Sequence, residues 1–169
     1  IQFHQSVTSF LVKYINSRLT VIAKNMLSSA VLSDMAVRHA ITREYLAIVR
    51  GVVTPASGTI TAPLSRKPGS IIERCVDFEH GERAVTHYKT LETKNGHSLV
   101  SLQLETGRTH QLRIHSQLLG HPILGCDLYG GLELPGCEQA PRLMLHASAL
   151  DFVHPVSGEP MQIRCAAPF

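Results

Sequence analysis

The segment at residues 104–131 carries arginine and histidine side chains at spacings that could serve chemistry on an anionic partner. Gly107 permits a tight turn after an expected strand, and Thr109 can cap the helix that follows. On that helix His110 and Arg113 lie at i and i+3 and therefore share one side. Arginine is permanently charged and offers a planar fork of N–H donors that suits carboxylates and phosphates. The pattern predicts a helix that presents cationic and hydrogen-bonding groups along one face.

Three other interpretations of these side chains stay open. Arginine and histidine at helical spacing also form ordinary solvated faces. His110, His115 and His121 could approach one another as metal ligands, but neither helical histidine has the i, i+4 partner that is typical of zinc sites, so we expect no metal. A hydrolase built on His110 and His115 lacks a convincing nucleophile.

Length and composition indicate one domain spanning residues 1–169, large enough to bury a core. The net charge of +3 and the pI near 8.8 are compatible with a polyanionic partner. The four cysteines, at positions 75, 126, 137 and 165, form no CxxC pair, which favours free thiols in a reducing cytoplasm. No apolar run approaches the ~20 residues of a membrane span. We expect a cytoplasmic monomer with no membrane partner.

Hydrophobic periodicity predicts the elements that must position these residues. A short apolar run at residues 19–23 indicates a buried central strand, and residues 26–40 indicate an amphipathic helix with Met26, Ala30, Val31, Met35 and Ala36 on its apolar side. Further strands are expected at residues 42–53, 58–64, 71–76, 84–91, 98–105, 143–153 and 161–165, with a hairpin turn at Lys94-Asn95-Gly96. Strand clusters without βα alternation predict an α+β fold with a mixed, mainly antiparallel sheet flanked by a few helices.

Four ordered motifs resemble those of the RluA-type pseudouridine synthases. GRTHQLRIH at residues 107–115, followed by GHP and YG, matches the family helix, and LTVIAKN (19–25), TREYLAIVRG (42–51) and RLMLHASALDFVHPVSGE (142–159) match in order and spacing. The resemblance covers residues 19–169. It implies the antiparallel-rich α+β fold and an enzyme that isomerises uridine to pseudouridine in ribosomal or transfer RNA, without a cofactor.

The resemblance also implies roles for individual residues. Tyr45 matches the family tyrosine that contacts the target base, although a strand tyrosine is also an ordinary core residue, and Arg113 matches the arginine that pairs with the nucleophilic aspartate. Leu145 matches the apolar wall of the base pocket. Three neighbours on the helix are expected to contact RNA phosphates or to hold the helix: Arg108, His110 and Gln111.

The family motif that carries the catalytic aspartate, HRLDxxTSG, is missing before residue 19, and Lys13 stands at the position of the aspartate. We expect that the sequence skips a segment with this aspartate between Asn16 and Ser17, leaving the catalytic domain incomplete on its N-terminal side. The alternative is a catalytically inactive RNA-binding relative. A buried Arg113 without a carboxylate would be costly, which favours the active enzyme. Cys126 stands where relatives often carry aspartate, with Asp127 following, which puts the role of that loop in doubt.

Overall fold

The computed structural model describes residues 4–7, 10–15, 18–130 and 140–169, and its residues group into two compact units. The first unit holds Ile1–Tyr45 and His146–Phe169, and the second holds Leu46–Leu145. The boundary falls inside strand β4 (Ile41–Arg50) and after the first residue of strand β10 (Leu145–Val153). Whether the two units act as the single domain expected from the sequence stays a prediction.

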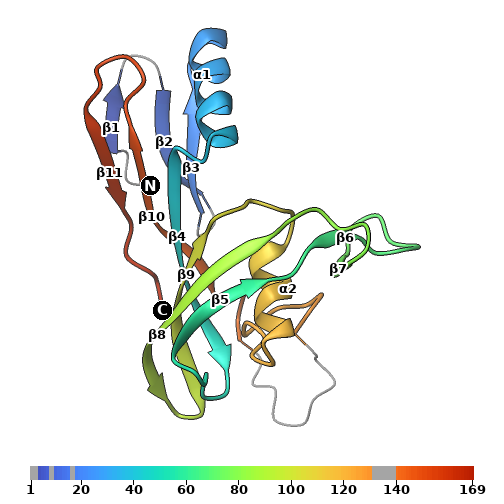
Figure 1. Cartoon of the computed structure of the whole chain (residues 1–169). Helices are drawn as coiled ribbons and strands as arrows, with labels where there is room; N and C mark the ends of the chain where they lie inside the picture. The colour runs from blue at the N-terminus through green and yellow to red at the C-terminus, as the bar shows by residue number, and fades with distance from the viewer. Residues whose placement is uncertain (1–3, 8–9, 16–17, 131–139) are drawn as a thin grey trace. The chain divides into compact units, whose positions relative to one another are not determined.

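The first unit combines a three-stranded sheet, one helix and a terminal hairpin (Figure 1). Strands β1 (His4–Val7), β2 (Phe10–Ile15) and β3 (Arg18–Ala23) pair antiparallel in that order. Helix α1 (Met26–Val37) begins at Asn25, whose Oδ1 accepts a hydrogen bond of 2.8 Å from the Ser28 N–H. Strand β10 pairs antiparallel with β11 (Pro160–Arg164), and the core gathers around Leu150, Phe152 and Met161.

Two expectations for this unit need correction. The strand at residues 19–23 is confirmed, but within the described part of the chain β3 is an outer strand rather than a central one, and Ile22 is 40% exposed. The helix is confirmed, but its apolar side was misjudged, because Met26 is 89% exposed. Met35 does contact the core as expected, together with Leu32, which the expected set left out. The error arose because the helix carries apolar residues on several sides, so that spacing alone did not identify the buried one.

The second unit is built on antiparallel strands and carries helix α2 (Gln111–Leu118) (Figure 1). Its sheet has the order β4-β9-β8-β5, in which β8 (Val85–Lys94) pairs antiparallel with both β9 (His97–Leu104) and β5 (Ser57–Thr61). Strands β6 (Leu64–Arg66) and β7 (Arg74–Val76) form a separate two-stranded sheet. Buried side chains from the sheet and from α2 form the core, among them Val49, Ile60, Tyr88, Leu102, Leu112 and Ile114.

The mainly antiparallel α+β fold is confirmed, with differences of detail in this unit. The β8–β9 hairpin turns at Asn95 and Gly96, both with positive φ (52° and 74°), as the Lys-Asn-Gly sequence predicts. The strand expected at residues 58–64 is divided into β5 and β6, and the one at 71–76 is shortened to β7. Ile71 is 84% exposed and lies outside the β6–β7 ladder, which includes Arg74–Val76 only. Among the described residues, no helix has the length and apolarity that a membrane span requires.

Candidate functional site

Helix α2 begins without a side-chain cap, contrary to the expectation for Thr109. The N-cap residue is His110, in a left-handed conformation (φ 59°), and its side chain makes no capping hydrogen bond. The turn is closed from inside the helix, because Gln111 Oε1 accepts a hydrogen bond of 2.9 Å from the Arg108 N–H. The start of α2 is therefore fixed by a residue that faces the core.

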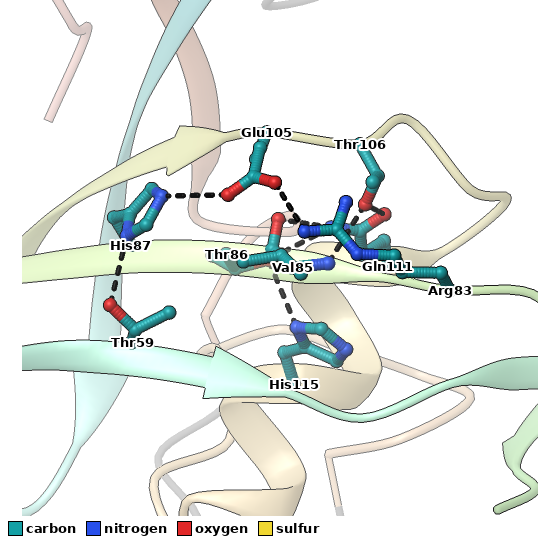
Figure 2. Close-up of polar contacts among 9 residues, drawn as sticks. All are labelled: Thr59, Arg83, Val85, Thr86, His87, Glu105, Thr106, Gln111 and His115. Carbon is teal, nitrogen blue, oxygen red and sulfur yellow. Dashed lines mark hydrogen bonds and ion pairs between the residues drawn. The ribbon is translucent and has the colours of Figure 1, made fainter.

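Gln111 is the centre of a buried polar cluster (Figure 2). Its Oε1 also accepts from the Thr106 hydroxyl (2.9 Å), and its Nε2 donates to the Val85 carbonyl (3.0 Å) and to Thr86 Oγ1 (3.0 Å). These contacts and the bond from Arg108 use all four hydrogen-bonding positions of the amide. Of the two roles expected for Gln111, this geometry favours holding the helix over contact with RNA.

His115 continues the same cluster one turn along the helix. It is fully buried, its Nδ1 lies 2.9 Å from Thr86 Oγ1 and its Nε2 lies 3.0 Å from the Ala62 carbonyl oxygen. Burial lowers the pKa of His115, while the hydrogen bond to Ala62 opposes that shift. Both ring nitrogens are engaged inside the protein, so the structure disfavours a hydrolase in which His115 transfers protons.

Arg113 projects from the same helix into a second cluster, formed with the loop that follows α2. Its Nε donates to Cys126 Sγ (3.2 Å), its Nη2 lies 2.5 Å from Asp127 Oδ1, and its guanidinium carbon lies 5.2 Å from the centre of the Tyr129 ring. The Arg113 side chain is 14% exposed, whereas that of Asp127 is 78% exposed. The fork of the arginine is therefore held in place, with its carboxylate partner on the solvent side.

Electrostatics in this cluster favour the ionised forms of both partners. Burial would lower the pKa of Arg113, but the contacts with Cys126 and Asp127 outweigh it and raise the pKa above its ordinary value. The hydrogen bond from Arg113 lowers the pKa of Asp127. The site therefore carries a permanent cation next to an exposed anion.

The loop after α2 is shaped by tight backbone contacts that place Cys126, Asp127 and Tyr129. Gly125 has φ 69°, and a Cβ on it would lie 2.0 Å from the Arg142 carbonyl oxygen, so a side chain is excluded there. The Tyr129 hydroxyl accepts a hydrogen bond from the Arg74 N–H (2.8 Å) and bonds to His110 Nδ1 (3.0 Å). This loop thereby ties the start of α2 to strand β7.

Arg108 lies outside the buried clusters, among charged side chains. It forms an ion pair with Glu82, and its Nε donates to the Arg83 carbonyl oxygen (3.1 Å). Arg83 Nη2 donates a hydrogen bond of 2.5 Å to the neighbouring Glu105, and this bond is the main reason that the pKa of Glu105 is lowered. Its other oxygen lies 3.4 Å from His87 Nε2 (Figure 2). Arg108 is exposed enough to contact RNA, but it would have to exchange Glu82 for a phosphate.

Two further expected site residues, Tyr45 and Leu145, belong to different units. Tyr45 is half-buried on β4 and belongs to the first unit, and Leu145 is half-buried at the start of β10 and belongs to the second. Their meeting with Arg113 in one cleft stays a prediction.

His110, His115 and His121 bond to different partners, His121 Nδ1 to the Arg50 carbonyl oxygen (2.7 Å). In the described part of the chain no three His, Cys, Asp or Glu side chains gather as metal ligands.

Sequence reasoning missed three residues that organise this site. Asp127 was noted only as the neighbour of an atypical cysteine, although a carboxylate two residues before the YG pair is the available signal. Tyr129 was part of a motif but had no assigned contact. Thr86 gave no signal, because a threonine on a strand is an ordinary β-forming residue.

The chain is similar to known proteins along most of its length. A model of the RNA pseudouridylate synthase family matches residues 19–118, from β3 to the end of α2. The chain is 39% identical over 152 residues to an uncharacterized RNA pseudouridine synthase, YjbO, of Bacillus subtilis, covering 90% of this chain and 52% of that protein. It is 38% identical over 160 residues to ribosomal large subunit pseudouridine synthase D of Escherichia coli, covering 89% and 48%. The chain thus spans about half the length of these curated relatives.

Two solved human structures have the same fold. Human RNA pseudouridylate synthase domain containing 1 superposes with a TM-score of 0.78 at 28% identity, covering 99% of this chain and 69% of that one. Human RNA pseudouridylate synthase domain containing 4 gives a TM-score of 0.71 at 25% identity, covering 89% and 67%.

Proposed function

The chain belongs to the RNA pseudouridylate synthase family, and from this premise we propose that it is part of an RNA pseudouridine synthase that isomerises uridine to pseudouridine. The names of several relatives refer to the large ribosomal subunit, which makes ribosomal RNA the first substrate to test and transfer RNA the second. The proposal includes a cytoplasmic location and a monomeric state, and it requires no cofactor.

The reaction breaks the bond between uracil N1 and ribose C1′, rotates the base and rejoins it through C5. It needs a carboxylate nucleophile, a cation that keeps the carboxylate ionised, a pocket for the flipped base and a group that removes the C5 proton. Arg113 is proposed as the cation, Tyr45 as the group beside the base and Leu145 as a wall of the pocket. Arg108 and His110 are proposed to contact RNA, and Gln111 to hold the helix.

The geometry of Arg113 is the observation that carries this proposal. Its guanidinium is fixed by Cys126, Asp127 and the Tyr129 ring, and it stays charged at every working pH. A cation fixed before substrate arrives needs no reorganisation during the reaction, which is the basis of electrostatic catalysis. The same guanidinium suits a carboxylate better than lysine would, because its donors form a planar fork.

The nucleophile is the open part of the proposal. The first acidic residue of the sequence is Asp34, in α1, and Lys13 occupies the position expected for the family aspartate. The junction of Asn16 and Ser17, where we expect a skipped segment, lies outside the described residues. An active enzyme requires that the intact protein supply a carboxylate to Arg113.

A second candidate is an RNA-binding relative without catalysis, and the Arg113–Asp127 pair removes one reason for rejecting it. Contrary to the expectation, Arg113 has a carboxylate partner among the described residues, because Asp127 lies 2.5 Å from it. The persistence of Arg113 therefore does not require a missing aspartate. Both candidates predict binding to RNA, and only the first predicts an isomerised product.

Product formation separates the two candidates. RNA from a strain that carries the gene and from a strain that lacks it is treated with a reagent that labels pseudouridine. The label is needed because isomerisation itself changes no mass, and the labelled sites are then mapped by mass spectrometry. The enzyme proposal predicts at least one uridine that is labelled only when the intact gene is present. An unchanged map, together with RNA binding by the purified protein, would support the non-catalytic relative.

A further inference from the structure

The position of each hydrogen in the buried polar cluster beneath α2 can be assigned, because several of its groups can only donate or only accept a hydrogen bond. The Arg108 N–H can only donate and the Val85 carbonyl can only accept, which fixes Oε1 and Nε2 of Gln111. The Ala62 carbonyl can only accept, so His115 carries its proton on Nε2. His115 Nδ1 then accepts from the Thr86 hydroxyl.

These assignments join into one directional chain of donors and acceptors. The Val85 N–H donates to Thr106 Oγ1 (2.8 Å), and the Thr106 hydroxyl donates to Gln111 Oε1. Gln111 Nε2 donates to Thr86 Oγ1, the Thr86 hydroxyl donates to His115 Nδ1, and His115 Nε2 donates to the Ala62 carbonyl. Every link lies inside the second unit. Figure 2 draws the links from Val85 to His115.

This chain of hydrogen bonds connects three segments to two successive turns of α2. Ala62 follows β5, Thr86 lies on β8 and Thr106 follows β9, whereas Gln111 and His115 face the core from the helix. Arg113 lies between these two on the helix and projects to Cys126 and Asp127. A shift or rotation of α2 that moved Arg113 would break buried hydrogen bonds, and an unsatisfied buried donor or acceptor is costly.

We propose that Thr86 and His115 are positioning residues that, together with Gln111, set where α2 presents the guanidinium of Arg113. The inference rests on the proposed function for what Arg113 does, but the geometry it asserts can be measured in the absence of turnover. Thr86 is the critical link, because its single hydroxyl accepts from Gln111 and donates to His115 at the same time.

Thr86→Val removes the hydroxyl at nearly constant volume, and Thr86→Ser restores it. Thr59→Val is the matched control, because Thr59 Oγ1 makes a hydrogen bond of the same length, 2.9 Å, to His87 Nδ1 on the exposed side of the sheet (Figure 2). The first measurement follows the Arg113 Nε–H by NMR in the intact protein. We expect the hydrogen exchange of this N–H to accelerate about tenfold or more in Thr86→Val, because interrupting the chain of hydrogen bonds leaves buried groups unsatisfied. Thr86→Ser and Thr59→Val should keep the wild-type rate.

An unchanged Arg113 Nε–H resonance and exchange rate in folded Thr86→Val would overturn the proposal, since the cluster would then stabilise the fold without positioning Arg113. A second measurement uses the wild type and does not depend on how the variants fold. Long-range ¹H–¹⁵N correlations should show His115 neutral, protonated on Nε2 only. A proton on Nδ1 at neutral pH would contradict the directional chain.

Turnover provides a third readout if the intact protein makes pseudouridine. Thr86→Val should then lower kcat about tenfold with KM nearly unchanged, because RNA contacts outside the cluster are kept. An equal loss in Thr59→Val, or no loss in Thr86→Val, would count against the proposal. Absence of turnover in the wild type would remove the enzyme proposal while leaving both NMR results decisive for this one.

Discussion

Arg113 and Asp127 form an ion pair of 2.5 Å in which the arginine is mostly buried and the aspartate is mostly exposed. Asp127 therefore gives Arg113 a carboxylate partner from within its own unit. The pair has two consequences, because it keeps Arg113 in place and it also competes with any other carboxylate for the same guanidinium.

Asp127→Asn tests the first consequence. We expect the free energy of unfolding to fall by less than about 1 kcal/mol, because one partner is exposed and solvent screens the pair. Turnover of the intact protein should stay within about tenfold of wild type, as for the loss of one charge-assisted hydrogen bond. Urea unfolding and single-turnover assays check the two values. Complete loss of turnover in a folded variant would instead make Asp127 part of the chemistry.

The stability of the second unit should depend on the protonation of His115. Burial lowers the pKa of His115 below its ordinary value of 6.5. The unfolded chain therefore binds a proton at His115 more readily than the folded chain does. The contribution of His115 to the free energy of unfolding is fully present above pH 6.5 and is lost as the pH falls below it. Urea unfolding between about pH 5 and pH 7.5 measures how the free energy of unfolding changes with pH. The carboxylates with a lowered pKa do not interfere, because they change their protonation only at lower pH.

His115→Gln is the comparison for this pH dependence. Its stability at neutral pH will be lower, but the part of the slope between about pH 5 and pH 6.5 that comes from His115 should disappear. An identical slope in the variant and the wild type would show that other groups cause it. NMR titration of the His115 ring gives the pKa directly.

RNA binding should weaken steeply with salt, because basic side chains release counterions when they contact phosphates. Arg108→Ala should reduce the slope of log affinity against log salt by about one. Arg164→Ala is the control, because Arg164 is also an exposed arginine in an ion pair, with Asp151, but lies in the other unit. Equal effects of the two substitutions would show that Arg108 contributes only net charge.

Much of the second unit could be predicted from the sequence. The Lys-Asn-Gly turn requires positive φ, which few residues adopt, so the β8–β9 hairpin followed from local chemistry. Helix α2 followed from its spacing and from the resemblance. In contrast, the apolar residues of α1 point in several directions, so its buried side depended on tertiary packing that periodicity does not reveal.

The partners of the site residues could not be predicted in the same way. Asp127 reaches Arg113 because Gly125 allows a turn that passes close to Arg142, a contact between segments distant in sequence. Thr86 contacts Gln111 and His115 across the interface between a strand and a helix. Such contacts depend on the relative placement of elements. The motif alone indicated that Gln111 was important, but not that it faces the core.

Tyr45, Leu145 and Arg113 are predicted to face one cleft in the intact protein. The expectation comes from their shared match to the family site, and a crystal structure of the intact protein with bound RNA would measure it directly. The side chains should surround one flipped base. Tyr45 and Arg113 on opposite faces of the sheet would refute the assignment of both residues.

The most direct test of the account is complementation of a strain that lacks the gene, with pseudouridine mapped in its ribosomal and transfer RNA. The intact wild-type gene should restore at least one missing site. Arg113→Ala should not restore it, because turnover falls by a factor on the order of 10² or more when a preorganised charge is removed, while the purified variant still binds RNA. Restoration of the same site by Arg113→Ala, or a map that is identical with and without the gene, would contradict the account.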